Sequence, residues 1–92
     1  MAPSAEFTKA ADDSKKLKQK PNNDELLELY ALYKIGNGED ISKVSKPGMF
    51  DLTGKAKYNA WQKEVEAGTS AADAQKKYVA KVKELQSKYG SN

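Results

Sequence analysis

Hydrophobic residues recur at steps of three and four in four separate segments of the chain, and this spacing limits its fold more than any other feature. Such steps place side chains on one face of an α-helix. The predicted helices cover about residues 4–18, 23–35, 53–67 and 70–89. β-Branched residues are few and no alternating run is bounded by turn residues, so strands are not expected. We therefore expect an all-α protein, a helix bundle that forms a single domain over residues 1–92 with an ordered core of about 5–90.

Capping residues mark the ends of the predicted helices. The expected N-caps, in chain order, are Ser4, Asn22 or Asn23, Thr53 and Ser70. The expected terminators are Pro21, then Gly36 and Gly38, then Gly68, and finally Gly90. The apolar stripes of the first, third and fourth helices are Phe7, Ala10, Ala11, Ser14 and Leu17; Tyr58, Trp61 and Val65; and Ala71, Ala74, Tyr78, Val82, Leu85 and Tyr89. Residues 39–52 should form a long loop, and the short turn at Gly68-Thr69 should make the third and fourth helices antiparallel neighbours.

The chain contains neither Cys nor His. Small secreted domains usually need disulfides, and the first residues lack the basic and apolar regions of a signal peptide, so we expect a cytoplasmic protein. No apolar run approaches the ~20 residues that span a bilayer. The missing His and Cys exclude the usual nucleophile–base pairs and histidine-ligated zinc. We therefore expect neither an enzyme nor a metal site, although catalysis by a Lys or a carboxylate stays open.

All sixteen basic residues are Lys, and the formal net charge is +3. Proteins that read DNA sequence favour Arg, whose planar fork pairs with guanine, whereas Lys serves well as a point charge for phosphate. The mild basicity therefore favours a small anionic ligand, or simply a solvated surface, over a long nucleic acid. A non-specific nucleic-acid binder is a weaker alternative, which the dispersed Asp and Glu residues also disfavour.

The segment ELLELYALYK, residues 25–34, holds the most informative pattern. Tyr30, Tyr33 and Lys34 share one helix face, while Leu29 and Leu32 point toward the opposite flank and the expected core. A Tyr stripe is more often part of a core, with the neighbouring Lys reaching for water. The alternative is that the rings stack on a nucleobase while their hydroxyls and the Lys meet phosphate.

A second pattern lies in residues 46–61, KPGMFDLTGKAKYNAW. Lys55 and Lys57 are expected in the first turn of the third helix, where the helix dipole disfavours positive charge. An anion bound near that helix start would reverse the penalty. Two solvated Lys residues that are merely tolerated explain the pattern equally well, so both readings stay open.

Taken in order, the motifs resemble those of the acyl-CoA-binding protein family. The shared features are Glu6-Phe7, Ala10-Ala11, Lys20-Pro21, ELLELYALYK, Lys46-Pro47-Gly48-Met49, GKAKYNAW, Tyr78 and KVKELQSKYG, which together span about residues 5–90. The resemblance implies a four-helix bundle with up-down-down-up order. It also implies an intracellular carrier of long-chain fatty acyl-CoA thioesters, without catalytic activity or cofactor.

The resemblance also assigns ligand-binding roles to eight residues. Tyr30, Tyr33 and Lys34 match binding residues of the family, Lys57 matches a lysine at the ribose 3′-phosphate, and Lys15 matches a first-helix lysine near the ligand. Tyr78 matches a tyrosine at the nucleotide, and Ala11 and Leu27 match positions that line the acyl groove. The resemblance further implies that the protein is a monomer whose partner is acyl-CoA. It implies no binding of nucleic acid and no stable insertion into membranes, but transient contact with membranes or with acyl-CoA-using enzymes.

The sequence departs from the family pattern in several places. Thr53 stands where many members carry a ligand-contacting Lys, and Tyr58 replaces a common Trp. The loop from Gly36 to Ser45 is one residue longer than usual, and two residues are added near Glu66. These changes bear on affinity and chain-length preference more than on ligand class. The alternative function is a helical protein-interaction module without a small-molecule ligand.

Overall fold

The structure is a computed structural model that describes residues 3–91. Residues 1, 2 and 92, which the expected domain included, lie outside the described part. The helices are α1 (Ala5–Ser14), α2 (Asn23–Gly36), α3 (Leu52–Glu66) and α4 (Ala71–Tyr89), with a short 3-10 helix, η1 (Ile41–Lys43), in the loop between α2 and α3. The described residues contain no strand, and their single β-bridge joins Leu17 to Ser91. The all-α prediction is confirmed.

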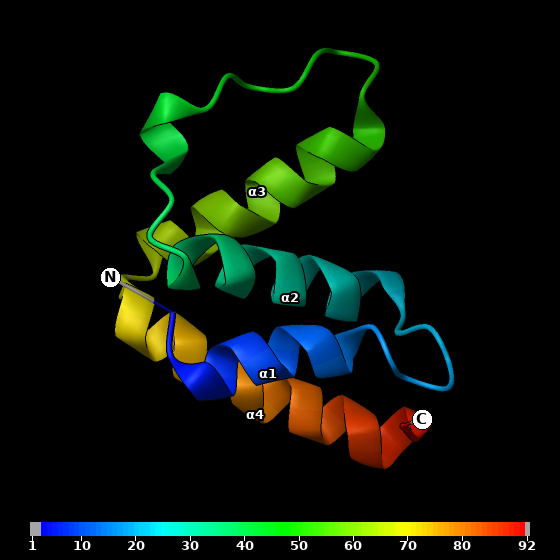
Figure 1. Cartoon of the computed structure of the whole chain (residues 1–92). Coiled ribbons are helices and arrows are strands. Elements are labelled where there is room, and N and C mark those ends of the chain that lie inside the picture. The colour runs from blue at the N-terminus through cyan, green and yellow to red at the C-terminus, as the bar shows by residue number, and fades with distance from the viewer. Residues whose placement is uncertain (1–2, 92) are drawn as a thin grey trace.

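Helix α2 lies at the centre of the arrangement. It packs against α3 on one side and α4 on the other, and α1 packs against α4. Helices α1 and α4 run in one direction while α2 and α3 run in the opposite one (Figure 1), which is the expected up-down-down-up order. Helices α3 and α4 are antiparallel, as the short turn between them predicted, but they are not the close neighbours we expected. Within the described chain α3 packs mainly on α2, because α2 carries apolar residues around much of its circumference and can serve two partners.

Three of the four helices begin where their capping residues predicted, at Ser4, Asn22 and Ser70. The Asn22 cap is a reciprocal capping box with Glu25. Helix α3 differs, because Asp51 rather than Thr53 is its N-cap. The Asp51 carboxylate accepts a hydrogen bond from the Gly54 amide at 2.9 Å, so the helix starts at Leu52.

Helix α1 ends earlier than its hydrophobic period indicated. It stops at Ser14 rather than near Lys18, and Leu17 reaches the core from outside the helix. The backbone of this segment pairs with the end of the chain instead: the Lys18 amide donates to the Gly90 carbonyl at 3.1 Å. A long-range pairing of this kind has no local sequence signal.

Gly36 is the last residue of α2 rather than the residue that stops it. A Cβ at this position would lie 2.8 Å from Cζ of Phe7 and 3.2 Å from Cγ of Gln75. The small residue is therefore needed because α1 and α4 pack closely there. The turn after the helix is made at Gly38, which has a positive φ of 76°.

The core forms one cluster along α2. Its buried members are Phe7, Ala10, Leu29, Ala31, Leu32, Ile35, Trp61, Ala74, Tyr78, Val82 and Leu85. Most of them belong to the predicted stripes. Val65 does not join it, since 41% of this residue is exposed.

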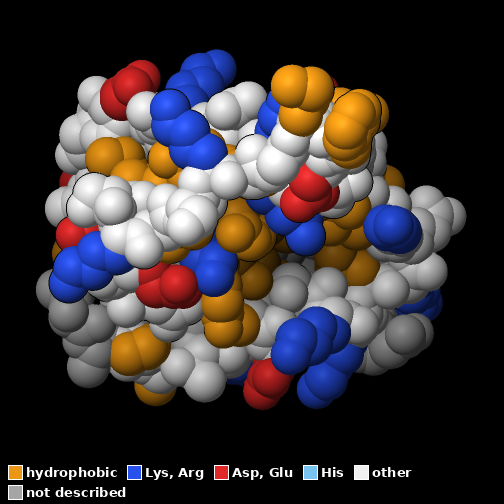
Figure 2. All heavy atoms as spheres, turned by 90° about the horizontal axis from the view of Figure 1, so that it is seen from above, with side chains coloured by type: hydrophobic (Ala, Val, Ile, Leu, Met, Phe, Trp, Pro, Cys, Tyr) orange, Lys and Arg blue, Asp and Glu red, His pale blue; other side chains and the backbone are white. Residues whose placement is uncertain are grey.

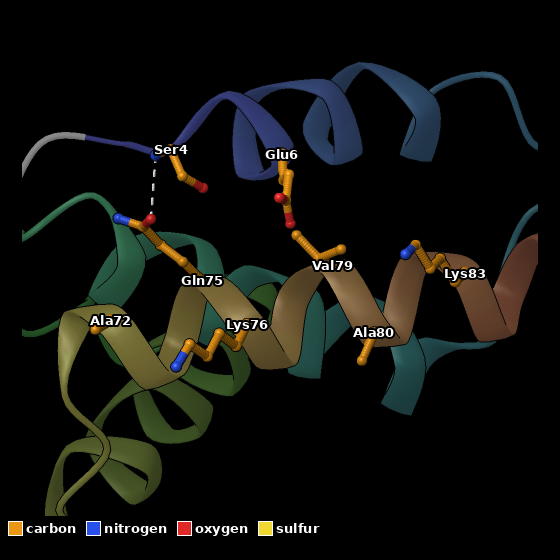
Figure 3. Close-up of a pocket in the computed structure, with 8 residues that line it drawn as sticks. All are labelled: Ser4, Glu6, Ala72, Gln75, Lys76, Val79, Ala80 and Lys83. Atoms are coloured by element: carbon orange, nitrogen blue, oxygen red, sulfur yellow. Dashed lines mark hydrogen bonds between the residues drawn. The ribbon is translucent and has the colours of Figure 1, made fainter.

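Two polar residues are buried beside this core, and both tie helices together. Gln75 donates from Nε2 to the Gly36 carbonyl at 2.8 Å and accepts from the Ser4 amide at 3.1 Å (Figure 3), so it joins the starts of α1 and α4 to the end of α2. Glu25 accepts from the Tyr89 hydroxyl at 2.5 Å and from Lys88 Nζ at 3.0 Å, which joins the start of α2 to the end of α4.

The pKa of the Glu25 carboxyl lies well below its usual range. The hydrogen bond from Tyr89 is the main cause, helped by the Asn22 amide and by Lys88, and together they lower the pKa from 4.5 to about 2 against the opposing effect of burial. Because the folded state has the lower pKa, the ionised carboxylate stabilises it fully above pH 4.5. This stabilisation is lost as the pH falls from 4.5 to about 2.

Replacement of this carboxylate tests its role. Glu25→Gln should lower the urea midpoint of unfolding at neutral pH, and the gap to the parent protein should close between pH 4.5 and about 2. Glu84→Gln is a suitable control, because Glu84 pairs with Lys81 on the surface, where ion pairs contribute little. A gap for Glu25→Gln that stays constant with pH would show that the ionised group does not stabilise the fold.

Candidate functional site

A cleft of about 440 Å³ opens where all four helices approach one another. Its lining residues are Ala11, Ser14, Lys15, Pro21, Leu26, Leu29, Tyr30, Tyr33, Lys57 and Tyr78. The lining thus combines aliphatic side chains, three Tyr rings and two Lys residues, and it contains no carboxylate. Viewed from above, the face that carries α3 is hollowed, with hydrophobic side chains inside and Lys side chains around them (Figure 2).

Six of the eight residues expected at the ligand site line this cleft. They are Ala11, Lys15, Tyr30, Tyr33, Lys57 and Tyr78. They come from α1 and the turn after it, α2, α3 and α4, so only the packing of the helices brings them together. Lys34 and Leu27 are not part of its lining: Lys34 lies near the Tyr30 ring, and Leu27 lies in a neighbouring groove.

Two of the cleft's Tyr rings pack on a buried Phe. Tyr33 lies 5.7 Å from Phe7 and 5.8 Å from Tyr78, and Tyr78 meets the Phe7 ring edge-on at 5.1 Å, all measured between ring centroids. Tyr33 is 40% exposed, whereas Tyr78 is almost fully buried. The core therefore fixes Tyr78 and supports Tyr33, which presents its free surface to the cleft.

The hydroxyl of Tyr78 donates to Ser14 Oγ at 3.3 Å, and Ser14 Oγ in turn donates to the Ala11 carbonyl at 2.7 Å. Burial raises the pKa of the Tyr78 phenol, the Ser14 hydrogen bond opposes that rise, and nearby Tyr33 adds to it. The phenol therefore stays neutral at physiological pH and keeps its proton in the hydrogen bond to Ser14.

The ring of Tyr30 is close to two Lys residues and to the core Trp. Lys57 Nζ is 5.4 Å from the centroid of its ring, and Lys34 Nζ is 5.6 Å from it. Trp61 meets Tyr30 edge-on with centroids 6.4 Å apart. Lys34 also forms an ion pair with Glu39 at 3.1 Å, which neutralises much of its charge toward a ligand. Lys57 is thus the cation that faces the cleft beside Tyr30.

Helix α3 begins earlier than the sequence indicated, so its Lys residues lie further from the helix start than expected. The helix begins at Leu52, so Lys57 lies in the second turn rather than the first. The dipole penalty fades beyond the first turn and does not single out Lys57. Lys55 lies just past the first turn and lines a separate small hollow with Lys46, away from the cleft.

A second groove, of about 470 Å³, adjoins the cleft along α2 and α3. Leu26 and Lys57 line both hollows, so the two lie next to each other. The groove holds Leu27, which the cleft does not, and also Leu52 and Thr53 from the start of α3. It is apolar along one side and bordered by Lys57 and Lys20.

Four residues of the cleft were not among the expected site residues: Ser14, Pro21, Leu26 and Leu29. Leu26 lies four residues before Tyr30 on the same helix face, so its position was readable from the helical period. Ser14 follows Ala11 by three residues in the predicted stripe of the first helix, so it was readable in the same way, whereas Pro21 carried no such signal. Leu29 was expected only in the core. It is buried there, and it also lines the cleft.

A larger hollow, of about 550 Å³, lies elsewhere, between the start of α1 and α4 (Figure 3). Its lining contains no aromatic side chain and none of the expected site residues. Glu6, Lys76 and Lys83 all line it, so the charges of this hollow are mixed. The aromatic and cationic cleft is the better candidate despite its smaller volume, because its chemistry is concentrated and uniform in sign.

Residues 3–91 also lack two kinds of feature. No group of three or more Asp, Glu, His or Cys side chains is placed to hold a metal ion. No helix in this part of the chain is long and apolar enough to cross a membrane. The cleft itself suits an amphipathic anion, because Lys15 and Lys57 can meet phosphate, the Tyr rings can stack on a flat base, and the aliphatic residues can cover a hydrocarbon.

Comparison with known proteins agrees with these features. A family model described as "Acyl CoA binding protein" matches residues 4–82. An acyl-CoA-binding protein homolog 1 from Caenorhabditis elegans is 54% identical over 85 residues, which cover 92% of this chain and 95% of the worm protein. An acyl-CoA-binding protein homolog from Manduca sexta is 48% identical over 80 residues, which cover 87% of each protein.

Two solved structures share the fold. The crystal structure of Oryza sativa acyl-CoA-binding protein 2 superposes with a TM-score of 0.77 at 32% identity and covers 90% of this chain and 89% of the rice chain. The solution structure of the acyl coenzyme A binding protein from yeast gives a TM-score of 0.73 at 40% identity. The superposition covers 96% of this chain and 99% of the yeast chain.

Proposed function

The chain belongs to the acyl-CoA-binding protein family, as its motifs predicted, and we therefore propose that it binds long-chain fatty acyl-CoA thioesters and acts as an intracellular carrier of them. The cleft lined by Lys15, Lys57 and three Tyr residues is the observation that supports this function. The family and both relatives are named for binding, which agrees with a carrier rather than an enzyme. The acyl-CoA is then the ligand, with no cofactor.

The parts of an acyl-CoA match different walls of the cleft. Lys57 and Lys15 meet phosphate groups, with Lys57 at the ribose 3′-phosphate. Tyr30 and Tyr33 offer ring faces to the adenine, and stacking on such a ring is worth roughly 1–3 kcal/mol per base. Tyr78, held in place by Phe7, lies at the nucleotide, where its hydroxyl oxygen can accept a hydrogen bond while its proton is donated to Ser14.

The acyl tail needs a dry surface, and the aliphatic residues supply it. Ala11, Leu26 and Leu29 form the floor of the cleft, and the adjoining groove extends this surface to Leu27. The tail follows this path, so its burial adds to the phosphate contacts at the other end of the ligand. Lys34 contributes indirectly, because its ammonium group contacts the rings of Tyr30 and Trp61 and so helps to hold Tyr30 in place.

Lys57→Ala tests the phosphate contact. The variant should bind acyl-CoA about ten- to a hundred-fold more weakly, since a hydrogen bond to a charged group contributes about 1.5–3 kcal/mol. It should lose much of this effect on an acyl-CoA analogue that lacks the 3′-phosphate. Isothermal titration calorimetry with both ligands measures the difference.

Lys63→Ala provides the matched control, because Lys63 is exposed on the same helix and lines neither hollow. It should bind both ligands as the parent protein does. Equal losses of the two ligands in Lys57→Ala would show that Lys57 contacts another part of the molecule.

The alternative is a helical interaction module without a small-molecule ligand. Native mass spectrometry of the purified protein with a mixed acyl-CoA pool separates the two functions. A carrier should retain long-chain acyl-CoA at one ligand per chain, whereas a protein-interaction module should retain none.

The remaining partner assignments are also proposals. We propose a monomer in the cytoplasm that binds no nucleic acid and does not insert stably into membranes. A carrier must receive and release its ligand, so transient contact with membranes or with acyl-CoA-using enzymes follows from the function.

A further inference from the structure

The ammonium group of Lys34 is paired with a carboxylate instead of standing free beside the cleft. Its Nζ lies 3.1 Å from Oε1 of Glu39, and the two side chains are 27% and 42% exposed. Within residues 3–91, the two Lys residues that line the cleft, Lys15 and Lys57, form no ion pair. Of the three Lys residues expected at the ligand, Lys34 is therefore the one whose charge is already offset in the described chain.

The loop after α2 fixes Glu39 beside Lys34. The Glu39 amide donates to the Lys34 carbonyl at 3.1 Å, and Gly38, with its positive φ of 76°, turns the chain back just before it. The Asn37 side chain donates to the Tyr33 carbonyl at 3.0 Å, which closes the same end of the helix. Lys34 and Glu39 are thus joined through the backbone as well as through their side chains. The fold therefore places this carboxylate at this ammonium group.

Lys34 stands at the edge of the site, although it does not line the cleft. Its Nζ lies 5.6 Å from the centroid of the Tyr30 ring, and Nζ of Lys57 lies 5.4 Å from the same centroid. Two ammonium groups thus lie near one ring, and that ring lines the cleft. A phosphate group bound at Lys57 beside Tyr30 is within reach of the long, flexible Lys34 side chain. Carboxylate and phosphate oxygens both accept hydrogen bonds from ammonium, so Glu39 competes with that phosphate.

We propose that Glu39 sets the affinity of the ligand site, because it holds the charge of Lys34 and so weakens the attraction of Lys34 for the phosphate groups of acyl-CoA. This inference rests on the proposed function, since it concerns the same ligand, but it assigns a role to a residue outside the cleft. Glu39 acts in two ways: its carboxylate pairs with Lys34, and its own negative charge repels the phosphates. Both effects weaken the binding of the nucleotide end and leave the binding of the acyl tail unchanged. A carrier benefits, because a ligand that is held less tightly is released faster.

The stability of the fold does not depend on this ion pair. Ion pairs between partly exposed side chains contribute little to the free energy of unfolding. The hydrogen bond between the Glu39 amide and the Lys34 carbonyl needs no carboxylate and remains without it. Lys34 also lies in the last turn of α2, where the helix dipole favours a positive charge in any case. Removal of the carboxylate should therefore change ligand binding more than folding.

Glu39→Gln tests the proposal, because it removes the charge and keeps the size of the side chain. The variant should bind octanoyl-CoA about three- to ten-fold more tightly than the parent protein, and its affinity should fall more steeply as salt is added. The gain should be absent with octanoyl-pantetheine, which carries the same tail and thioester without a phosphate group. Titration calorimetry measures both affinities, and thermal unfolding of the variant should be nearly unchanged.

Glu28→Gln is the matched control. Glu28 also lies on the outside of α2, pairs with Lys81 at 3.1 Å and has a similar side-chain exposure of 46%, but it lines neither the cleft nor the adjoining groove. This variant should bind octanoyl-CoA nearly as the parent protein does. A second control uses Lys34→Met as the starting protein: Glu39→Gln should lose most of its gain there, because the two residues act as a pair.

Two results would overturn the proposal and leave the function of the chain intact. The parent protein could bind octanoyl-CoA while Glu39→Gln binds it no more tightly, which would show that the ion pair has no effect on the ligand. The gain could also appear in Glu28→Gln or persist in full beside Lys34→Met, which would make it an effect of net charge alone. Failure of the parent protein to bind either octanoyl-CoA or palmitoyl-CoA would instead contradict the proposed function, and this inference with it.

Discussion

Palmitoyl-CoA is expected to bind this chain at least about a hundred-fold more tightly than octanoyl-CoA, because eight further methylenes find apolar surface to cover. Each fully buried methylene contributes about 0.8 kcal/mol, so eight would contribute about 6 kcal/mol. The hollows are open to solvent on one side, so we count about half of this, which corresponds to roughly a hundred-fold. The effect exceeds that expected from any single Lys contact.

Titration calorimetry across a series of acyl chain lengths, with free CoA as the zero point, measures this dependence. The heat capacity of binding should become more negative as the chain lengthens, because that is the mark of apolar burial. Equal affinities for CoA and palmitoyl-CoA would contradict the assignment of the groove to the tail.

Leu27→Ala separates the tail from the head of the ligand. Leu27 lines the groove next to the cleft but not the cleft itself. The variant should therefore weaken the binding of palmitoyl-CoA and leave the binding of free CoA unchanged. A loss that is the same for both ligands would place the nucleotide, and not the tail, beside Leu27.

Trp61→Ala is expected to cost about 3–5 kcal/mol of unfolding free energy, the largest effect of any single substitution discussed. Trp61 is 2% exposed and is among the largest fully buried side chains of the described residues. For a domain of this size each kcal/mol lowers the melting temperature by roughly 4–8 °C, so the midpoint should fall by at least roughly 12 °C. Differential scanning calorimetry measures the shift.

Trp61→Phe tests how much of the loss in Trp61→Ala comes from packing and how much from the indole nitrogen. Trp61 Nε1 is buried and has no hydrogen-bond partner among residues 3–91, so a Phe at this position gives up no hydrogen bond and restores most of the packing. It should cost less than half as much as Trp61→Ala. A Phe variant as unstable as the Ala variant would show that the indole nitrogen has a partner essential to the fold.

Trp61 also connects stability to the site. Its ring meets the Tyr30 ring edge-on, and Lys34 Nζ lies 5.8 Å from the centroid of the Trp61 ring. Trp61→Phe should therefore retain most of the affinity for acyl-CoA, whereas Trp61→Ala should lose affinity even at temperatures where it remains folded. Binding measured well below the melting midpoint separates this loss from unfolding.

Local features of the fold were predictable from the sequence to within a few residues. The caps at Ser4, Asn22 and Ser70 were identified because a capping side chain bonds to an amide only a few residues away. The cap of α3 was misplaced by two residues, since both Asp51 and Thr53 are suitable capping residues and the period alone does not choose between them. The end of α1 was missed because its competitor, the pairing of Lys18 with Gly90, lies far along the chain.

The candidate site was predictable in its residue types rather than in its geometry. The i, i+3, i+4 pattern placed Tyr30, Tyr33 and Lys34 on one face of α2, and all three lie on or behind that face. It could not reveal that Glu39 pairs with Lys34, since that contact depends on how the loop after the helix turns back. Lys57 was singled out by a dipole argument that the true helix start removes.

By itself the sequence determined four helices, most of their caps and core faces, and the family, because these depend on side-chain periods and hydrogen bonds that act within a turn or two of the chain. Only the tertiary structure decided that α2 separates α3 from α4, that α1 stops at Ser14, and that a cleft exists. The reason is that the cleft is made by Lys15, Tyr30, Lys57 and Tyr78, which lie on separate segments. Side chains so far apart in sequence share a site only after the burial of the core has set how the helices cross.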